Sequence, residues 1–353
     1  MRMLPNILPE KSRRGFLKIA AAAAVVPALA AGVRALGPRG KLYDGQLDVM
    51  GAVSELALWH EDPAVAGRAI GQVRAEVARL NGIFSLTRDD SEISRLNRDG
   101  FLDNPSWELR DVLGVGRRFS ELSSGAFDIS VQPLWQLYAA HFWPDPGKSG
   151  ANKSTDIDAD ARRLAERLVD YRLIDIGSRR IKFGRPGMGV TLNSIGQGFV
   201  ADRIAGMLGE QGFQHVYADL GETRLVGDHP DGRPWRIGLR DPKDPARFGR
   251  MLDLEDIGLA VSGGCGTQFE ETGRYHHIFD PRTGLSAAKM TAIAVTAPRA
   301  MIANGLATSI YVAGREQAAK ILGAHSGAKA VITTEGGEWL ASQADGSFAA
   351  FSA

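Results

Sequence analysis

The chain has 353 residues but only one cysteine, Cys265, and this scarcity excludes several kinds of site. A single thiol cannot form a disulfide within the chain or build a thiolate metal cluster. Cys265 also lies too far from the N-terminus to be a lipoprotein anchor. Because it stands between two glycines after an apolar segment, we interpret it as a small packed residue without a catalytic role.

The sequence also lacks a strong excess of charge of either sign. Its 42 basic and 41 acidic residues give a formal net charge of +1. The first thirty residues carry five basic side chains and one acidic side chain, so without them the net charge falls from +1 to −3. A slightly acidic protein has no electrostatic basis for binding nucleic acid, and we expect no nucleic-acid partner.

The one long apolar run follows an arginine pair near the N-terminus. Ser12-Arg-Arg-Gly-Phe-Leu-Lys18 precedes the apolar residues 19–31, which are too few and too rich in alanine to span a bilayer stably. The pattern matches a twin-arginine export signal, and Ala28-Leu29-Ala30 is a small-x-small cleavage motif. We therefore expect residues 1–30 to be a signal peptide, recognised by the twin-arginine translocase, and the folded protein to be periplasmic. An uncleaved N-terminal membrane anchor is the alternative.

Helical and strand patterns alternate along the rest of the chain without a strict repeat, which excludes solenoids and propellers and favours an α+β fold. Apolar spacing predicts helices over residues 63–80, 107–122, 159–169, 198–209 and 300–312. Strand patterns cover residues 173–176, 180–183, 189–192, 215–219, 223–227, 235–239 and 257–261. Residues 144–155 are predicted to be a mobile loop, and residues 228–234 a hairpin loop.

The segment from Arg274 to Gly284 concentrates polar chemistry, with two imidazoles, a carboxylate, guanidinium groups and a hydroxyl. Asp280-Pro281 and Gly284 predict a turn that presents these side chains from a loop. In the helical pattern that follows, Asn304 and Thr308 are four residues apart and share one face. Two oxygen ligands near a polar loop suggest a hard metal ion that holds a phosphate. The glycine-bearing segment 193–198 before a helix is a weaker phosphate-binding signal.

A larger set of motifs occurs in a fixed order. These are Met50-Gly51, Phe84-Ser85 followed by Ser91–Asn97, Gly125-Ala-Phe-Asp128, Ile195–Asp202, Asp219-Leu-Gly221, Ser262-Gly263, His277–Gly284 and Ala303–Thr308. In this order they resemble the ApbE family, the FAD:protein FMN transferases, over residues 44–340. The resemblance implies an α+β, T-fold-like protein with mixed sheets packed with helices. It also implies an enzyme that uses Mg²⁺ to move FMN from FAD, through a phosphoester bond, to a threonine of a partner flavoprotein, releasing AMP.

The same resemblance implies roles for individual residues. The FAD site would include Met50, Thr87, Ala126, Phe127, Asp128, Thr191, Gln197 and Ile278. The metal site would consist of the Ser194 carbonyl, Asn304 and Thr308. His277 and Asp280 would act at the transferred phosphate, and His277 could carry a proton near neutral pH.

Several positions depart from the family pattern. The family usually has a lysine at Gln197, aspartates at Thr191 and Asn304, an aromatic residue at Thr87, and an acidic or amide residue at Gly264. Most of these changes remove charge, and a neutral amide is a weaker ligand for a hard cation than a carboxylate.

Three hypotheses follow. The chain is an active exported transferase, an exported FAD-binding carrier with weakened or no transfer, or an interaction domain without flavin. Within the family, the leader and the otherwise complete chain resemble the accessory protein of bacterial nitrous oxide reductase. The client would then be a membrane flavoprotein.

Overall fold

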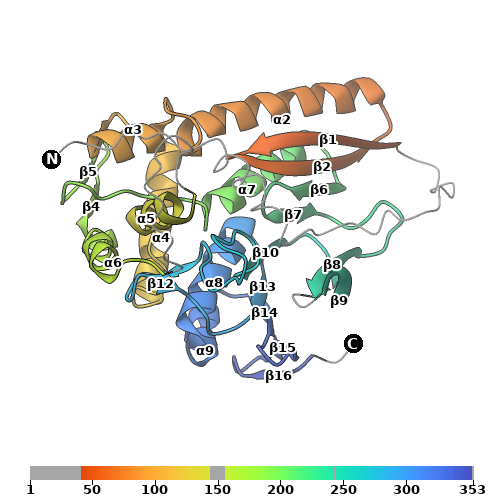
Figure 1. Cartoon of the computed structure of the whole chain (residues 1–353). Helices are drawn as coiled ribbons and strands as arrows, with labels where there is room; N and C mark the ends of the chain where they lie inside the picture. The colour runs from red at the N-terminus through yellow and green to blue at the C-terminus, as the bar shows by residue number, and fades with distance from the viewer. Residues whose placement is uncertain (1–40, 144–155, 242–243, 352–353) are drawn as a thin grey trace.

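The computed structural model describes residues 41–143, 156–241 and 244–351 (Figure 1). The predicted signal peptide at 1–30 and the predicted mobile loop at 144–155 lie outside the described residues. The helices are α2 (Pro63–Phe84), α3 (Glu92–Asp99), α4 (Trp107–Leu122), α5 (Gln132–Phe142), α6 (Ala159–Glu166), α7 (Gly196–Glu210), α8 (Ala300–Ala313) and α9 (Arg315–Gly323), with a 3-10 turn at Tyr171–Leu173.

Nine strands form the main sheet, in the order β1-β2-β6-β7-β10-β13-β14-β15-β16, and neighbouring strands are antiparallel. Their bounds are β1 (Lys41–Val49), β2 (Ala52–His60), β6 (Val216–Asp219), β7 (Thr223–Val226), β10 (Gly258–Gly263), β13 (Ala292–Ala297), β14 (Lys329–Thr333), β15 (Trp339–Ser342) and β16 (Phe348–Ala350). Smaller sheets pair β3 (Phe101–Asp103) and β4 (Ile174–Ile176) with β5 (Arg180–Phe183), β8 (Trp235–Asp241) with β9 (Asp244–Leu254), and β11 (Phe279–Asp280) with β12 (Leu285–Ser286). This arrangement confirms the predicted α+β class.

The main sheet has a hydrophobic core on each face, and strand β2 shows how one sequence contributes to both cores. Leu56 and Leu58 point into the larger core, which α2, α7 and α8 share. Ala57 and Trp59, at the alternate positions, face a smaller core together with the hairpin β8–β9, which supplies Trp235. Because side chains alternate along a strand, an apolar run of this kind is expected where a sheet is covered on both sides.

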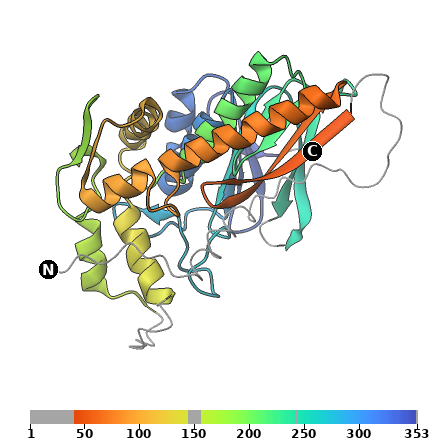
Figure 2. The same cartoon turned by 90° about the horizontal axis from the view of Figure 1, so that it is seen from above.

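Helix α2 is the longest of the described helices, and its sequence explains where it begins and how it packs. The Asp62 side chain accepts the N–H of Ala64 at 2.7 Å, and Pro63 fits the first turn of a helix. Val73 and Leu80 are fully buried at helical spacing. The helix consequently lies along the β1–β2 hairpin (Figures 1 and 2). None of the described helices is both long and apolar enough to cross a membrane.

Helices α7 and α8 pack closely because a glycine lies between them. A Cβ at Gly198 would lie 2.6 Å from both the carbonyl oxygen of Ala300 and the Cα of Met301. Asp202 of α7 then caps α8, since its carboxylate accepts the N–H groups of Ala300 at 2.8 Å and Met301 at 3.1 Å. These contacts fix the position of α8, the helix that carries Asn304.

The helical part of the molecule, α3–α6 with β3, β4 and β5, lies beside one end of the main sheet (Figure 1). Trp135 and Tyr138 of α5 pack there in an aromatic cluster with Phe269 and Phe279. The Tyr138 hydroxyl donates to the carbonyl of Gly284 at 2.8 Å. The helical part therefore holds the segment 269–284 in place.

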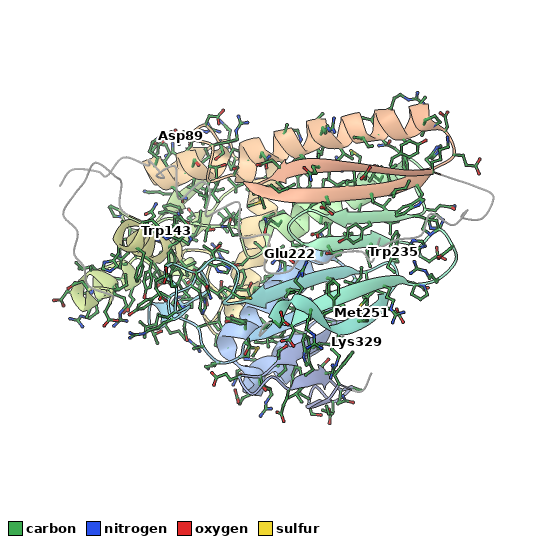
Figure 3. The ribbon with its side chains drawn as sticks, turned by 45° about the vertical axis from the view of Figure 1, so that its right-hand side comes forward. Asp89, Trp143, Glu222, Trp235, Met251 and Lys329 are labelled. Atoms are coloured by element: carbon green, nitrogen blue, oxygen red, sulfur yellow. The ribbon has the colours of Figure 1, made fainter. Side chains whose placement is uncertain are left out.

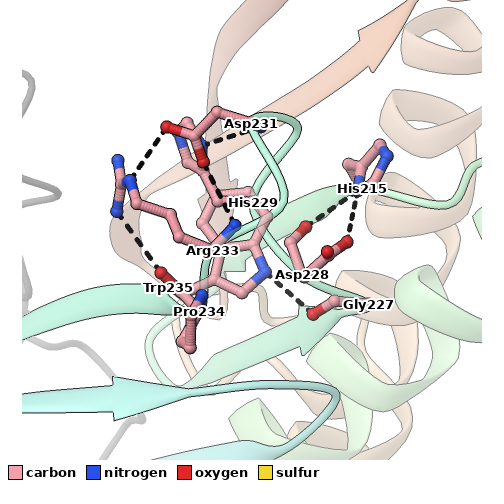
Figure 4. Close-up of polar contacts among 8 residues, drawn as sticks. All are labelled: His215, Gly227, Asp228, His229, Asp231, Arg233, Pro234 and Trp235. Atoms are coloured by element: carbon pink, nitrogen blue, oxygen red, sulfur yellow. Dashed lines mark hydrogen bonds and ion pairs between the residues drawn. The ribbon is translucent and has the colours of Figure 1, made fainter.

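The loop between β7 and β8 is not the predicted hairpin loop, because β7 belongs to the main sheet whereas β8 pairs with β9. Polar contacts tie this loop together (Figure 4). Asp231 contacts the Nδ1 atom of His229 at 2.7 Å and the Nε atom of Arg233 at 2.9 Å. The indole N–H of Trp235 donates to the Gly227 carbonyl at 3.0 Å. These bonds fix the start of β8 against the smaller core.

Most predicted elements are confirmed, but the predicted strand at 189–192 is wrong. This segment makes only an isolated bridge between Gly189 and Val131. The Asn97 side chain replaces a neighbouring strand, accepting the N–H of Val190 at 2.7 Å and donating to its carbonyl at 2.8 Å. The helix predicted at 159–169 is also shorter, because α6 ends at Glu166.

Candidate active site

A cavity that is partly open to solvent is lined by residues of both the helical part and the main sheet with its covering helices, and its empty space, open mouth included, is about 930 Å³. The described lining residues are Ala126, Phe127, Asp128, Val131, Trp135, Thr191, Asn193, Ser194, Gln197, Gly221, Glu222, His277, Ile278, Phe279, Pro281, Asn304 and Thr308. Figure 3 shows Glu222 where the main sheet meets the helical part, which is marked by Trp143.

Ten of the thirteen predicted site residues line this one cavity, although they come from segments far apart in the sequence. They are Ala126, Phe127, Asp128, Thr191, Ser194, Gln197, His277, Ile278, Asn304 and Thr308. The fold thus brings the predicted metal ligands, the predicted flavin-contacting residues and the histidine to a common space.

Met50 and Thr87, two of the residues predicted to contact FAD, are not among the described residues that line the cavity. Met50 is 3% exposed and packs beneath the start of α7, where its Cε would lie 3.1 Å from a Cβ at Gly196. It adopts a φ of 54°, and its N–H donates to the Asn81 side chain at 2.8 Å. The hydroxyl of Thr87 lies 2.8 Å from that of Ser85. Both residues therefore support the surrounding elements.

Asp280 is also absent from the cavity lining, because its side chain is engaged in the turn that follows it. Its Oδ1 accepts the N–H of Arg282 at 3.0 Å, and both carboxylate oxygens contact the Arg282 guanidinium at 2.7 Å. The Asp280 carbonyl accepts the N–H of Gly284 at 2.9 Å, and Gly284 has a φ of 65°. The predicted turn is confirmed, but the carboxylate organises this turn and does not face the cavity.

Asn304 places a buried oxygen at the cavity. The residue is 2% exposed, and its Nδ2 donates to Oε1 of Glu222 at 2.6 Å. Its Oδ1 has no hydrogen-bond partner in the part of the chain that the structure describes. Thr308 lies one helical turn further, with its hydroxyl 3.4 Å from that of Ser262. An unpartnered buried oxygen is costly, so its retention here points to a ligand that is a cation or a hydrogen-bond donor.

The donor set suits a hard cation better than a transition metal. The described residues contain no group of three or more His, Cys, Asp or Glu side chains able to hold a metal. Asn304, Thr308 and the Ser194 carbonyl offer only oxygen atoms, which Mg²⁺ and Ca²⁺ prefer.

Glu222 also lines the cavity, and the sequence reasoning missed it. It follows a turn at Gly221, which has a φ of 90°. The side chain of Gln197 packs directly against Gly221. Burial raises the pKa of Glu222 well above its usual range, and the negative charge of Asp219 raises it further. The available signal was its place directly after the Asp219-Leu-Gly221 motif, but most glutamates beside a turn are solvated.

His277 is held by the backbone of Thr267, whose nitrogen and carbonyl oxygen each lie 3.2 Å from the His277 Nδ1. Burial lowers the pKa of His277 to about 4, and the neighbouring His276 lowers it further. The imidazole is therefore neutral at neutral pH. This corrects the expectation that it titrates near neutrality: the ring can accept a proton during a reaction but does not carry one beforehand.

Phe127 and Asp128 line the cavity but are also fixed by the fold. Phe127 is 2% exposed, and its ring centroid lies 5.7 Å from that of Phe119. The Asp128 Oδ1 accepts the N–H and the hydroxyl of Ser130 at 2.7 and 2.6 Å, while Oδ2 accepts the N–H of Tyr171 at 3.1 Å. Burial raises the pKa of Asp128, and these hydrogen bonds oppose the change. Both carboxylate oxygens are thus engaged in ordering this wall.

The departure at Gly264 has a packing reason. A Cβ there would lie 2.8 Å from the Cδ2 of His276 and 3.1 Å from the hydroxyl of Tyr311. The adjacent Cys265 is exposed, which corrects the interpretation of it as a packed residue. Six further lining residues were also missed, although Asn193 directly precedes Ser194; they are Val131, Trp135, Asn193, Gly221, Phe279 and Pro281.

The ApbE family model matches residues 50–332 of the chain. The FAD:protein FMN transferase of Vibrio cholerae is 31% identical over 255 residues, covering 69% of this chain and 74% of that protein. That of Haemophilus influenzae is 28% identical over 264 residues, covering 71% and 74%. The solved structure of the flavin transferase ApbE from Vibrio cholerae superposes with a TM-score of 0.71 at 24% identity, covering 88% of this chain and 97% of that one, which shows a common fold. On the family match and the shared fold, this chain belongs to the ApbE family.

Proposed function

We propose that the chain transfers the FMN half of FAD to a threonine hydroxyl of a partner flavoprotein. The observation that carries this proposal is the convergence of ten predicted residues on one cavity. The curated relatives named above are FAD:protein FMN transferases, which supports it. In this reaction the threonine oxygen bonds to the FMN phosphorus, the bond from that phosphorus to the AMP oxygen breaks, and the threonine proton is released.

The residues present fit a magnesium ion. Asn304 Oδ1, the Thr308 hydroxyl and the Ser194 carbonyl would hold it, and the unpartnered Asn304 oxygen is the observation that supports the fit. None of the described lining residues is a lysine or arginine, so the protein itself supplies little positive charge for a pyrophosphate. When bound, Mg²⁺ would neutralise the charge that develops on the phosphates.

The protein's own side chains would orient the substrates and accept a proton. His277, neutral at neutral pH, is suited to accept the threonine proton. Trp135 and Ile278 offer apolar surface suited to a flavin ring. The hydrogen bonds that Asp128 accepts hold the neighbouring part of the cavity lining in place. Gln197 packs over Gly221 and stabilises the turn that leads to Glu222.

The competing function is an FAD carrier without transfer, and the neutral side chains of Gln197 and Asn304 favour it. To separate the two, purified residues 31–353 would be incubated with FAD, Mg²⁺ and a threonine-bearing flavoprotein domain. We expect the domain to gain the mass of one FMN. Binding of FAD that is later recovered intact, with no mass gain, would instead establish the carrier.

His277→Ala tests the proton acceptor in the same assay. We expect the transfer rate to fall by about 10²–10⁴-fold, the usual contribution of general acid–base catalysis, with FAD binding retained. A rate equal to that of the wild type would exclude this role for His277.

We also propose export by the twin-arginine translocase and a periplasmic site of action, with a membrane flavoprotein, such as one serving nitrous oxide reductase, as the client. The Arg13-Arg14 pair and the following apolar run support export. Replacing both arginines by lysine should leave the protein in the cytoplasmic fraction. Periplasmic recovery of this double variant would contradict the proposed route.

A further inference from the structure

The side chain of His276, next to the proposed proton acceptor, is buried and is not among the described residues that line the cavity. Its Nε2 atom lies 2.8 Å from the carbonyl oxygen of Ala287, and its Nδ1 atom lies 3.3 Å from the backbone nitrogen of Ile278. A carbonyl can only accept a hydrogen bond, and a backbone N–H can only donate one. The two partners therefore fix the neutral tautomer that carries its hydrogen on Nε2, which leaves Nδ1 as an acceptor.

The surroundings of the His276 ring support this neutral form. Burial lowers the pKa of His276, and the bond to the Ala287 carbonyl opposes this change without cancelling it. A proton on Nδ1 would point at the Ile278 N–H and would break that hydrogen bond. The ring also lies over Gly264, where a Cβ would be 2.8 Å from the ring carbon Cδ2. The glycine therefore leaves the room that the ring needs.

The hydrogen bond to Ile278 restrains a segment that carries two cavity residues. His277 and Ile278 both line the cavity. The N–H of Ile278 has no acceptor other than Nδ1 of His276 among the residues that the structure describes. Because Ile278 is buried, loss of this acceptor would leave its N–H unpaired away from water. An unpaired buried N–H is costly, and the segment can relieve that cost only by moving.

Backbone hydrogen bonds hold this segment on both sides of the ring contact. The N–H of His277 donates to the Thr267 carbonyl at 3.0 Å, and the carbonyl of Ile278 accepts the N–H of Ala287 at 2.9 Å. A side-chain acceptor that binds the N–H two residues further on also closes a tight turn, as asparagine commonly does. His276 thus fixes the backbone between the two cavity side chains.

We propose that His276 is a positioning residue of the flavin site, which accepts the Ile278 N–H and thereby directs the side chains of His277 and Ile278 into the cavity. The inference rests on the proposed function, because it takes FAD as the ligand of this cavity. Without the acceptor, only a fraction of the molecules keeps the segment in the conformation that binds. The measured affinity for FAD then falls in proportion to that fraction.

Two substitutions separate the two hydrogen bonds of the ring. In His276→Asn, the side-chain oxygen can still accept the N–H two residues further on, but the donor to Ala287 is lost. In His276→Gln, the longer amide can still donate to the Ala287 carbonyl, but the acceptor close to the backbone is lost. From the cost of an unpaired buried N–H, we expect His276→Gln to bind FAD roughly tenfold more weakly than the wild type, and His276→Asn to stay within about threefold of it.

Titration of purified residues 31–353 with FAD, in the presence of Mg²⁺ and without a client, measures these affinities through flavin fluorescence. His60→Gln is the matched control, because Nδ1 of His60 likewise accepts the N–H of Asp62, two residues further on, at 2.9 Å. His60 is not among the described lining residues, and this variant should bind FAD as the wild type does. A merely structural role would weaken the two His276 variants equally, and tighter binding by His276→Gln would assign the role to the Ala287 contact. Either result would refute the inference.

Gly264→Ala tests the same role with His276 in place. Its Cβ would displace the ring from Ile278, and we expect FAD to bind roughly tenfold more weakly, within the usual cost of overpacking. Should neither His276 variant fold, this substitution decides alone, and an affinity equal to that of the wild type would overturn the inference. If the wild type binds FAD but transfers no FMN to a client, the proposed transfer is refuted, while the order of these affinities still decides the role of His276. If the wild type binds no FAD, both are overturned.

Discussion

Two acidic residues on either side of one turn, Asp219 and Glu222, have pKa values raised by burial. Such groups are unfavourable for folding and tend to occur where a site uses them. The turn between them joins β6 to β7, and Glu222 beyond it lines the cavity. At the scale of single residues, burial of these two groups therefore lowers the free energy of unfolding at the place where we propose that the protein binds a cation.

Asp219 makes this cost measurable. Burial raises its pKa to about 7, and the charge of Glu55 adds to the effect. The unfolded value is near 4, so between about pH 4 and 7 the folded state keeps a proton that the unfolded state has lost. The free energy of unfolding therefore falls as pH rises through this window. Asp219→Asn should be more stable than the wild type at pH 8 by up to about 4 kcal/mol, at about 1.4 kcal/mol per pKa unit, and the difference should shrink toward pH 4.

Urea unfolding of both proteins across pH 4–8 measures this difference. Glu55→Gln provides a check, since it removes only the smaller cause and should give a smaller gain at pH 8. A difference between wild type and Asp219→Asn that does not change with pH would contradict the assignment.

The sequence motifs predicted which residues belong to the site region, but not which side chains reach the cavity. Asp280 is drawn away by Arg282, and Met50 is covered by the start of α7. Glu222 can be recognised as a site residue only once the fold places Asn304, eighty-two positions away, beside it. Pairings between distant residues determine these outcomes, and a single sequence does not reveal them.

Among the elements, the contact between α7 and α8 is the one that positions the proposed ligand Asn304. Gly198→Ala would place a Cβ 2.6 Å from backbone atoms of Ala300 and Met301, which cannot move as a side chain can. We expect the free energy of unfolding to fall by about 1–3 kcal/mol, the usual cost of overpacking, measured by urea denaturation.

Gly206 on the same helix is the matched control, because no atom lies within 4 Å of a Cβ built there. Gly206→Ala should be neutral or stabilise the protein by up to about 1 kcal/mol, through helix propensity. Equal effects of the two substitutions would show that the close packing of α7 on α8 is not what makes Gly198 necessary.

Helices and strands were predicted well where the features that define them, such as apolar spacing and capping residues, lie within or next to their own residues. Helix α4 and strand β5 have the predicted bounds, because apolar spacing, a serine cap at residue 106 and a stop at residue 123 are local features. Residues 189–192 have a strand-like sequence, yet an asparagine side chain takes the place of a partner strand. The order of nine strands in the main sheet was likewise beyond prediction, because it depends on contacts across the whole chain.

At the scale of the whole molecule, the cavity depends on both parts being in place. One wall comes from residues 126–135 of the helical part, and the others from residues 191–197, 221–222, 277–281 and 304–308. The aromatic cluster around Tyr138 connects α5 to the segment that carries His277. A ligand in this cavity would therefore contact segments that are distant in sequence and would restrain them together.

Hydrogen exchange measured by mass spectrometry tests this shared site. A ligand that contacts all of these segments suppresses their local opening. On addition of FAD and Mg²⁺, we therefore expect slower amide exchange in all of them together, that is, in residues 126–131, 221–222, 277–281 and 304–308. The hairpin β8–β9, which covers the opposite face of the main sheet, is the internal control and should exchange at an unchanged rate. Protection limited to one wall would mean that FAD binds elsewhere, and protection of β8–β9 alone would place it on the other face.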